Sequence, residues 1–282
     1  MRRFRYVVID VFTDKALAGN QLAVFTDARD LTSEDMQDLA REMNFSESVF
    51  VLPATSRDDA DVRIRIFTPA NELPFAGHPI LGAAFVLGAP LQKIVIRLET
   101  AAGVVPVTLE REGPKLVFGS MEQPVPRWEP VANAAEVLAA LGVAESGLPV
   151  ERYELGPGHL YVELESPEAV AALQPDLAAL ERATPDAANC FARDGARWKS
   201  RMFAPAHGVA EDPATGSAAG PLAIHLARHG RIAWGEQIEI VQGVEIGRPS
   251  TLFAQADGSA EQIERVTVGG SAVTVARGEF SL

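Results

Sequence analysis

Two residues able to bind or move protons lie beside glycines at the expected starts of two apolar helices. His78 follows Gly77 in "LPFAGHPILGAAFVLG", and Asp212 stands four residues before Gly216 in "DPATGSAAGPLAIHL". A glycine at a helix start lets a ligand approach the first free backbone N–H groups, at the positive end of the helix dipole. The two segments therefore predict two sites for an anionic group, or one anionic ligand held by both helix starts.

The residues around these glycines predict where each helix begins and ends. Pro79 suits the first helical position, which makes His78 the expected cap residue. Ser217 is a residue type favoured at N-caps. Gly88 and Gly230 stand where C-caps are expected.

Glu47 is an acidic residue at the start of an apolar strand, in "NFSESVFVL". The simpler interpretation is that Glu47 lies just outside the sheet. The alternative is that partial burial raises its pKa toward neutrality and makes it a general acid and base. His78 and Asp212 also have simpler interpretations: His78 as a capping or core histidine, and Asp212 as the start of an Asp-Pro turn.

The remaining histidines show no spacing with carboxylates or cysteines that is typical of metal ligands. They are His159, His207, His225 and His229. Two of them, His225 and His229, are expected on the solvated face of one helix. The chain also has no GxGxxG, Walker or GxSxG motif. The sequence therefore predicts neither a metal nor a cofactor.

Composition limits the partners that the chain can have. Its 282 residues, 47% of them hydrophobic, suffice for two cores. The 25 basic and 38 acidic residues give a net charge of −13, which argues against nucleic acid and anionic membrane but not against a small anion. The single cysteine, Cys190, excludes an internal disulfide framework, is expected to serve packing, and fits a cytoplasmic protein. The longest apolar stretch, Pro79 to Leu91, is too short to span a bilayer.

An internal repeat gives the expected architecture. "FTPANELPFAGHP" aligns with "FAPAHGVAEDPATGSA" when three residues are inserted. The alignment pairs Phe67 with Phe203, Pro69 with Pro205, Ala70 with Ala206, Pro74 with Pro213, and Gly77 with Gly216. Each copy reads as a strand, a loop and a glycine before an apolar helix. The sequence thus predicts two related α+β domains, each a curved antiparallel sheet wrapped around a central helix.

Several ordered segments together resemble one known family. They are "DVFTDKALAGNQLAVF", "NFSESVFVLPA", "RIFTPANELPFAGHPILGAAFVL", "EDPATGSAAGPLA" and "IVQGVEIGRPS". The chain resembles the phenazine biosynthesis PhzF-like isomerases, within the diaminopimelate epimerase fold superfamily. The resemblance implies two pseudo-symmetric domains, 1–119 and 120–282, with the last strand, about 274–282, as a candidate to complete the first. It also implies a homodimer and a cofactor-free proton shift on a small carboxylate in a cleft between the domains.

The resemblance also assigns roles to residues. It implies that Glu47 is the proton shuttle and that His78 and Asp212 bind and polarise the substrate. Ser217, with the backbone N–H groups beside Gly77 and Gly216, would hold the substrate carboxylate. Weaker candidates for the wall of the site are Asn20, Gln242 and Gly243.

Two positions separate this chain from the related epimerases, which place a cysteine before each glycine. The chain has Ala76 and Thr215 there, so two-thiol epimerisation is excluded and a one-base isomerisation by Glu47 remains. Two alternatives stay open: an epimerase that uses Glu47 with Asp212 or His78, and a catalytically silent binding protein on the same scaffold. The sequence does not indicate which small carboxylate is the substrate.

Overall fold

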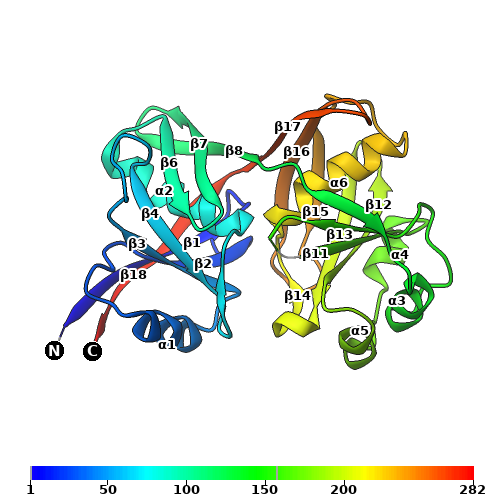
Figure 1. Cartoon of the computed structure of the whole chain (residues 1–282), viewed down its shortest axis with the longest axis horizontal. Coiled ribbons are helices and arrows are strands. Elements are labelled where there is room, and N and C mark those ends of the chain that lie inside the picture. The colour runs from blue at the N-terminus through cyan, green and yellow to red at the C-terminus, as the bar shows by residue number, and fades with distance from the viewer. Residues whose placement is uncertain (1, 157) are drawn as a thin grey trace. The chain divides into compact units, whose positions relative to one another are not determined.

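The chain folds into two compact units. The structure is a computed structural model that describes residues 2–156 and 158–282. Unit 1 comprises the chain up to Glu122 together with Gly269–Leu282, and unit 2 comprises Gln123–Val268. The end of the chain returns to unit 1 because β18 (Ala272–Ser281) pairs antiparallel along β1 (Arg3–Val11), and the two strands run side by side in Figure 1. The expected second domain, 120–282, therefore differs from unit 2 mainly in this last segment.

Unit 1 is built on one mixed sheet. Its other strands are β2 (Asn20–Phe25), β3 (Glu47–Leu52), β4 (Val62–Phe67), β5 (Glu72–Leu73), β6 (Val95–Thr100), β7 (Gly103–Glu112) and β8 (Lys115–Gln123). The order is β18-β1-β2-β3-β4-β6-β7-β8, with β5 beside β4. The pairs β2–β3 and β4–β6 are parallel, so the expectation of a wholly antiparallel sheet was wrong. A parallel pair needs a longer crossover than a hairpin turn, and these two crossovers contain the helices of the unit.

Helix α1 (Ser33–Met43) begins with a capping box. The Thr32 hydroxyl accepts from the Asp35 N–H at 3.1 Å, and the Asp35 carboxylate accepts from the Thr32 N–H at 3.0 Å. Its buried residues Met36 and Leu39 pack into a cluster with Phe50 of β3. The α1 crossover thus covers one face of the sheet.

Helix α2 (Gly77–Leu91) is the central helix of unit 1. It contacts β1, β2, β6 and β7, and its residues from Gly77 to Ala84 are buried whichever way they face. At Gly82 a Cβ atom would lie 2.6 Å from Leu22 Cδ2, so the missing side chain lets the helix approach the sheet. The expected C-cap at Gly88 was wrong, because the helix continues to Leu91 and closes at Gln92 in the left-handed region.

Unit 2 repeats this plan. Its strands are β9 (Arg127–Pro130), β10 (Glu151–Glu154), β11 (Gly158–Glu163), β12 (Ala187–Asp194), β13 (Arg197–Ala204), β14 (Val209–Asp212), β15 (Ile238–Gln242), β16 (Ser250–Gly258) and β17 (Ile263–Gly270). Its helices are α3 (Ala134–Leu141), α4 (Pro167–Ala171), α5 (Leu177–Ala183), α6 (Gly216–Arg228) and the short 3₁₀ turn η1 (Pro205–His207). The order β9-β10-β11-β12-β13-β15-β16 has its parallel pairs at β11–β12 and β13–β15, as in unit 1.

The strand registers confirm the internal repeat. In unit 1, Phe67 of β4 pairs with Ser48 of β3, and in unit 2 Phe203 of β13 pairs with Ala188 of β12. These are the two phenylalanines that the sequence repeat aligns. The expected fold, two pseudo-symmetric domains with a sheet around a central helix, is therefore confirmed.

Two further expectations concern Cys190 and membrane-spanning helices. Cys190 on β12 is fully buried in the core of unit 2, and burial raises the pKa of its thiol to about 12. A thiol in that state is inert, so Cys190 contributes packing. In the described ranges, no helix has the length and apolar character that crossing a membrane would require.

Candidate active site

Helix α2 begins at a position that differs from the expected one. The N-cap is Ala76, which is extended at φ −155° and ψ 138°, and its carbonyl accepts from the Ile80 N–H at 3.4 Å. His78 and Pro79 are therefore the second and third helical residues, and the expected cap at His78 was wrong. Since proline has no N–H, Gly77 and His78 supply the N–H groups at positions 1 and 2 of the helix, which have no acceptor within the helix.

His78 is buried between an amide and a carboxylate. Its side chain is 4% exposed; its Nδ1 lies 3.3 Å from Asn20 Nδ2, and its Nε2 lies 3.5 Å from Glu47 Oε2. The Ser46 hydroxyl donates to Asn20 Oδ1 at 3.3 Å. Burial lowers the pKa of His78 to about 3, so the ring is neutral at pH 7.

Glu47 is the first residue of β3, paired in parallel register with Leu22 of β2. The side chain of Glu47 is 16% exposed and faces His78. The interpretation that Glu47 lies outside the sheet was therefore wrong. Unit 1 thus brings together three of the expected site residues, Glu47, His78 and Asn20.

Helix α6 begins at Gly216, shortly after β14 ends at Asp212. Thr215 is its N-cap, and Ser217 is the second helical residue rather than the cap. Gly230, expected at a C-cap, follows the cap residue His229 in the left-handed region at φ 69°. The Ser217 Oγ lies 3.0 Å from Nε2 of His159.

A hydrogen-bonded group of three side chains joins the loop before α6 to the end of β15. Thr215 Oγ1 donates to Asp212 Oδ2 at 2.5 Å. Gln242 Nε2 donates to the Asp212 carbonyl at 2.8 Å and to Thr215 Oγ1 at 3.0 Å. All three residues are buried. Unit 2 therefore brings Asp212 and Gln242 together through Thr215.

Gly243, the next residue after β15, has a positive φ of 76°. A Cβ atom there would lie 2.5 Å from the Arg248 carbonyl oxygen and 2.6 Å from that of Pro213. Only glycine fits this position. Gly243 thus lets the loop after β15 approach the Asp212–Pro213 turn, although no ligand role follows from its geometry.

His159 is the residue of this region that the sequence analysis set aside. It is 1% exposed, contacts Ser217 and lies 3.3 Å from Asn189 Nδ2 through its Nδ1. Burial lowers the pKa of His159 to about 3. No spacing in the sequence signals this contact, because 58 residues separate His159 from Ser217.

A second cluster in unit 2 surrounds Glu151. Its carboxylate Oε2 lies 3.2 Å from His225 Nδ1, 3.2 Å from His229 Nε2 and 2.6 Å from Arg228 Nη1. His225 is fully buried, so the expected solvated face was wrong for this residue. Within the described residues these two histidines and Glu151 could offer ligand atoms to a metal, all within 4.8 Å of one another. Burial raises the pKa of Glu151, but hydrogen bonds with His225, Arg228 and His229 hold it well below its usual range, and Arg228 already balances the charge of the carboxylate.

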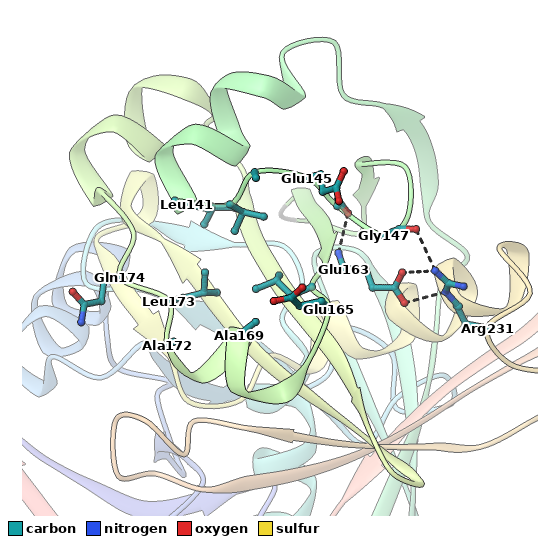
Figure 2. Close-up of a pocket in the computed structure, with 15 residues that line it drawn as sticks. Leu141, Glu145, Gly147, Glu163, Glu165, Ala169, Ala172, Leu173, Gln174 and Arg231 are labelled. Carbon is teal, nitrogen blue, oxygen red and sulfur yellow. Dashed lines mark hydrogen bonds and ion pairs between the residues drawn. The ribbon is translucent and has the colours of Figure 1, made fainter.

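A cavity of about 1020 Å³ lies elsewhere in unit 2 (Figure 2). Its lining includes Glu145, Glu163 and Glu165, and Arg231 forms an ion pair with Glu163 at 2.6 Å. None of the expected site residues lines it. An acidic lining also disfavours an anionic ligand, so this cavity does not match the site that the sequence predicts.

The fold is of the epimerase type, and comparison with known proteins identifies the chain as an isomerase. The family of phenazine biosynthesis-like proteins matches residues 9–278, and the chain belongs to this family. It is 57% identical over 278 residues to trans-2,3-dihydro-3-hydroxyanthranilate isomerase of Pseudomonas aeruginosa, and the alignment covers 99% of each chain.

Solved structures show the same fold. A PhzF-family phenazine biosynthesis protein of Bacillus anthracis superposes with a TM-score of 0.87 at 24% identity, covering 100% of both chains. A hydroxyproline epimerase of Agrobacterium vitis superposes with a TM-score of 0.67 at 12% identity, covering 99% of this chain and 92% of that one. The fold is thus shared with epimerases that have little sequence in common with this chain.

Proposed function

We propose that this isomerase moves a proton between carbon atoms of a small carboxylate-bearing substrate, with Glu47 as the acid and base and without a cofactor. Trans-2,3-dihydro-3-hydroxyanthranilate is the first substrate to test, because a relative that is 57% identical over nearly its whole length is named for it. The observation that carries the proposal is that the partly buried Glu47 on β3 faces the buried His78 of α2, with Oε2 and Nε2 3.5 Å apart.

The first step is removal of a proton from carbon by the Glu47 carboxylate. The electron pair of the broken C–H bond moves into the substrate, where its negative charge needs stabilisation. Backbone N–H groups at helix starts are preorganised donors for such charge, typically worth several kcal/mol. We assign this role to the N–H groups beside Gly77 and Gly216, and binding of the substrate carboxylate to Ser217.

The second step returns the same proton to another carbon. Protonated Glu47 donates it, and the electron pair of the intermediate forms the new C–H bond, so no oxidant or reductant is consumed. His78 suits this cycle because burial keeps its ring neutral. A neutral ring adds no positive charge that would hold Glu47 permanently in its ionised form. We assign to His78 and Asp212 the binding and polarisation of the substrate.

An epimerase that uses Glu47 is the second candidate, because the fold is shared with a hydroxyproline epimerase. It would invert one carbon atom and incorporate solvent hydrogen there. The isomerase would instead change the position of a double bond. A cytoplasmic homodimer stays a prediction from the sequence.

The test is solvent deuterium uptake by NMR over a panel of small carboxylates that includes trans-2,3-dihydro-3-hydroxyanthranilate. Wild type should isomerise one member, and Glu47→Gln should lose at least about 10²-fold in kcat, the usual range for a positioned acid and base. Glu42→Gln, an exposed residue of α1, is the matched control and should keep wild-type activity.

The position of the label separates the candidates. Solvent deuterium at a carbon that is inverted would favour the epimerase. A shifted double bond, with either the original hydrogen or solvent deuterium at a second carbon, supports the isomerase. An active Glu47→Gln variant would contradict the shuttle. Binding without turnover, unchanged by Glu47→Gln, would instead indicate a silent binding protein.

A further inference from the structure

We propose that His159 is a positioning residue, which holds the Ser217 hydroxyl so that its hydrogen is available to a bound substrate carboxylate. The inference deepens the proposed function, on which it rests for the ligand of Ser217. It concerns only side chains of unit 2, and its argument runs from Asn189 through His159 to Ser217.

The first step fixes the amide of Asn189. Its Nδ2 lies 3.4 Å from the Leu160 carbonyl oxygen and 3.3 Å from His159 Nδ1. A carbonyl oxygen only accepts hydrogen bonds. Turning the amide over would place its own oxygen against the Leu160 oxygen, so the nitrogen must face this side. The hydrogen-bond network thus assigns Asn189 Nδ2 as a donor toward His159.

The second step fixes the tautomer of His159. Because Nδ1 accepts from Asn189, the ring proton of the neutral imidazole is on Nε2. The ring stays neutral at working pH because burial lowers the pKa of His159 to about 3. Nε2–H therefore points at Ser217 Oγ, 3.0 Å away, and donates to it.

The third step concerns the hydroxyl of Ser217. A serine hydroxyl can donate once and accept twice. His159 occupies an acceptor lone pair, so the hydrogen of Ser217 is left for another acceptor. Ser217 is the second residue of α6, where backbone N–H groups also lack helical acceptors. A carboxylate, which only accepts, matches this set of donors. The opposite tautomer would turn Ser217 into a donor to His159 and remove one donor from the site.

The tautomer can be measured without any ligand. In uniformly ¹⁵N-labelled protein, long-range ¹H–¹⁵N spectra distinguish a protonated Nε2 from a protonated Nδ1, and His159→Gln identifies the signals of His159. We expect the Nε2–H tautomer, unchanged from pH 8 to pH 5. A proton on Nδ1, or an imidazolium in this range, would overturn the proposal whatever the substrate is.

The functional consequence is measured with a double-mutant cycle on His159 and Ser217. His159→Leu should raise KM for trans-2,3-dihydro-3-hydroxyanthranilate about tenfold, the effect of one lost hydrogen bond, while kcat stays within about threefold. His159→Gln, which retains an N–H donor, should recover about half of that loss on a logarithmic scale. In a Ser217→Ala background, His159→Leu should change KM by less than about twofold. Gln174→Leu, at an exposed position of unit 2, is the control and should leave KM unchanged.

Each outcome decides between positioning and plain packing. If the effects of His159→Leu and Ser217→Ala on KM are additive, the two residues act independently and the proposal is wrong. The proposal is also wrong if His159→Leu lowers kcat and the free energy of unfolding but leaves KM unchanged, because His159 then only fills space. If this substrate is not turned over, the same cycle is read from the Kd of anthranilate by calorimetry. If the reaction is absent but His159 and Ser217 still show coupled effects on this Kd, the proposed function is refuted and the role of His159 is supported.

Discussion

The two helix starts, α2 in unit 1 and α6 in unit 2, have the same surroundings in the fold and different chemistry. Each follows a short strand beside a parallel crossover, and the second helical residue of each contacts a polar side chain. At α2 that residue is His78, which faces the carboxylate of Glu47. At α6 it is Ser217, which faces the imidazole of His159. The topology fixes where a helix start lies, and single residues at strand ends decide what it can do.

The strand registers identify the counterpart of Glu47. Ser48 pairs with Phe67 in unit 1, and Ala188 pairs with Phe203 in unit 2, so Ala187 corresponds to Glu47. Unit 2 therefore has no carboxylate where unit 1 has its candidate acid and base. This difference teaches that only one half of the duplicated fold carries the group proposed to move the proton.

The residue before each helix glycine differs as well. Ala76 has no side-chain hydrogen bond at the start of α2, whereas Thr215 bonds both Asp212 and Gln242. In unit 1, the strand that corresponds to β15 ends in Thr100, which donates to the Gly103 carbonyl at 2.8 Å and closes a turn. Unit 2 instead uses the end of that strand to support its helix start.

The largest expected effect on stability comes from placing a carboxylate at Ala187, the counterpart of Glu47 in unit 2. Ala187→Glu would place a carboxylate at a site that is 1% exposed and that packs in a small apolar cluster with Met202 and Ala204. We expect the free energy of unfolding to fall by about 3 kcal/mol more than in Ala187→Gln, which has similar volume and no charge. Guanidinium denaturation at pH 7 measures the difference. Equal stability of the two variants would show that unit 2 can also accommodate a carboxylate there.

A smaller effect on stability is expected when the N-cap of α6, Thr215, loses its hydroxyl and so resembles Ala76, the N-cap of α2. Thr215→Val keeps the shape of the side chain but removes the donor to Asp212, as at Ala76. The buried carboxylate then loses one hydrogen-bond donor, so the free energy of unfolding should fall by about 1 to 3 kcal/mol. Thr251→Val, at a partly exposed position of β16, is the control and should stay within about 0.5 kcal/mol. A loss no larger than the control's would mean that the Thr215 contact contributes nothing to stability.

The smallest effect is a pH dependence that the two helix starts should share. His78 and His159 have pKa values of about 3 when folded, against an ordinary value near 6.5. Between these values the unfolded chain binds protons that the folded chain does not, so stability rises with pH across this window and is flat above it. Each histidine should contribute a slope of about 1 kcal/mol per pH unit.

Denaturation midpoints from pH 4 to pH 7 test this dependence. His78→Gln and His159→Gln should each reduce the slope by the same amount. An unaltered slope in either variant would show that the histidine in question is protonated in the folded state. The two helix starts would then differ electrostatically as well as chemically.

Much of the fold could be predicted from the sequence because its signals are local or repeated. The capping box at Thr32, the alternation along β4 and the apolar stretch of α2 are each encoded in adjacent residues. The duplication was visible because Phe67 and Phe203 lie in similar segments, and the registers confirm it. The ends of α2 were predicted less well, since an extended Ala76 and a left-handed Gln92 depend on how the neighbouring chain is held.

The sequence by itself determined the two duplicated halves, their central helices, the family and the candidate residues Glu47, His78 and Asp212. Only the tertiary structure decided which side chains meet. Glu47 faces His78 because a parallel crossover brings β3 beside β2, and His159 reaches Ser217 across 58 residues of chain. The burial that keeps both histidines neutral likewise comes from packing. Local patterns specify helices and strands, whereas contacts between distant residues depend on strand register, which follows from the packing of the whole unit.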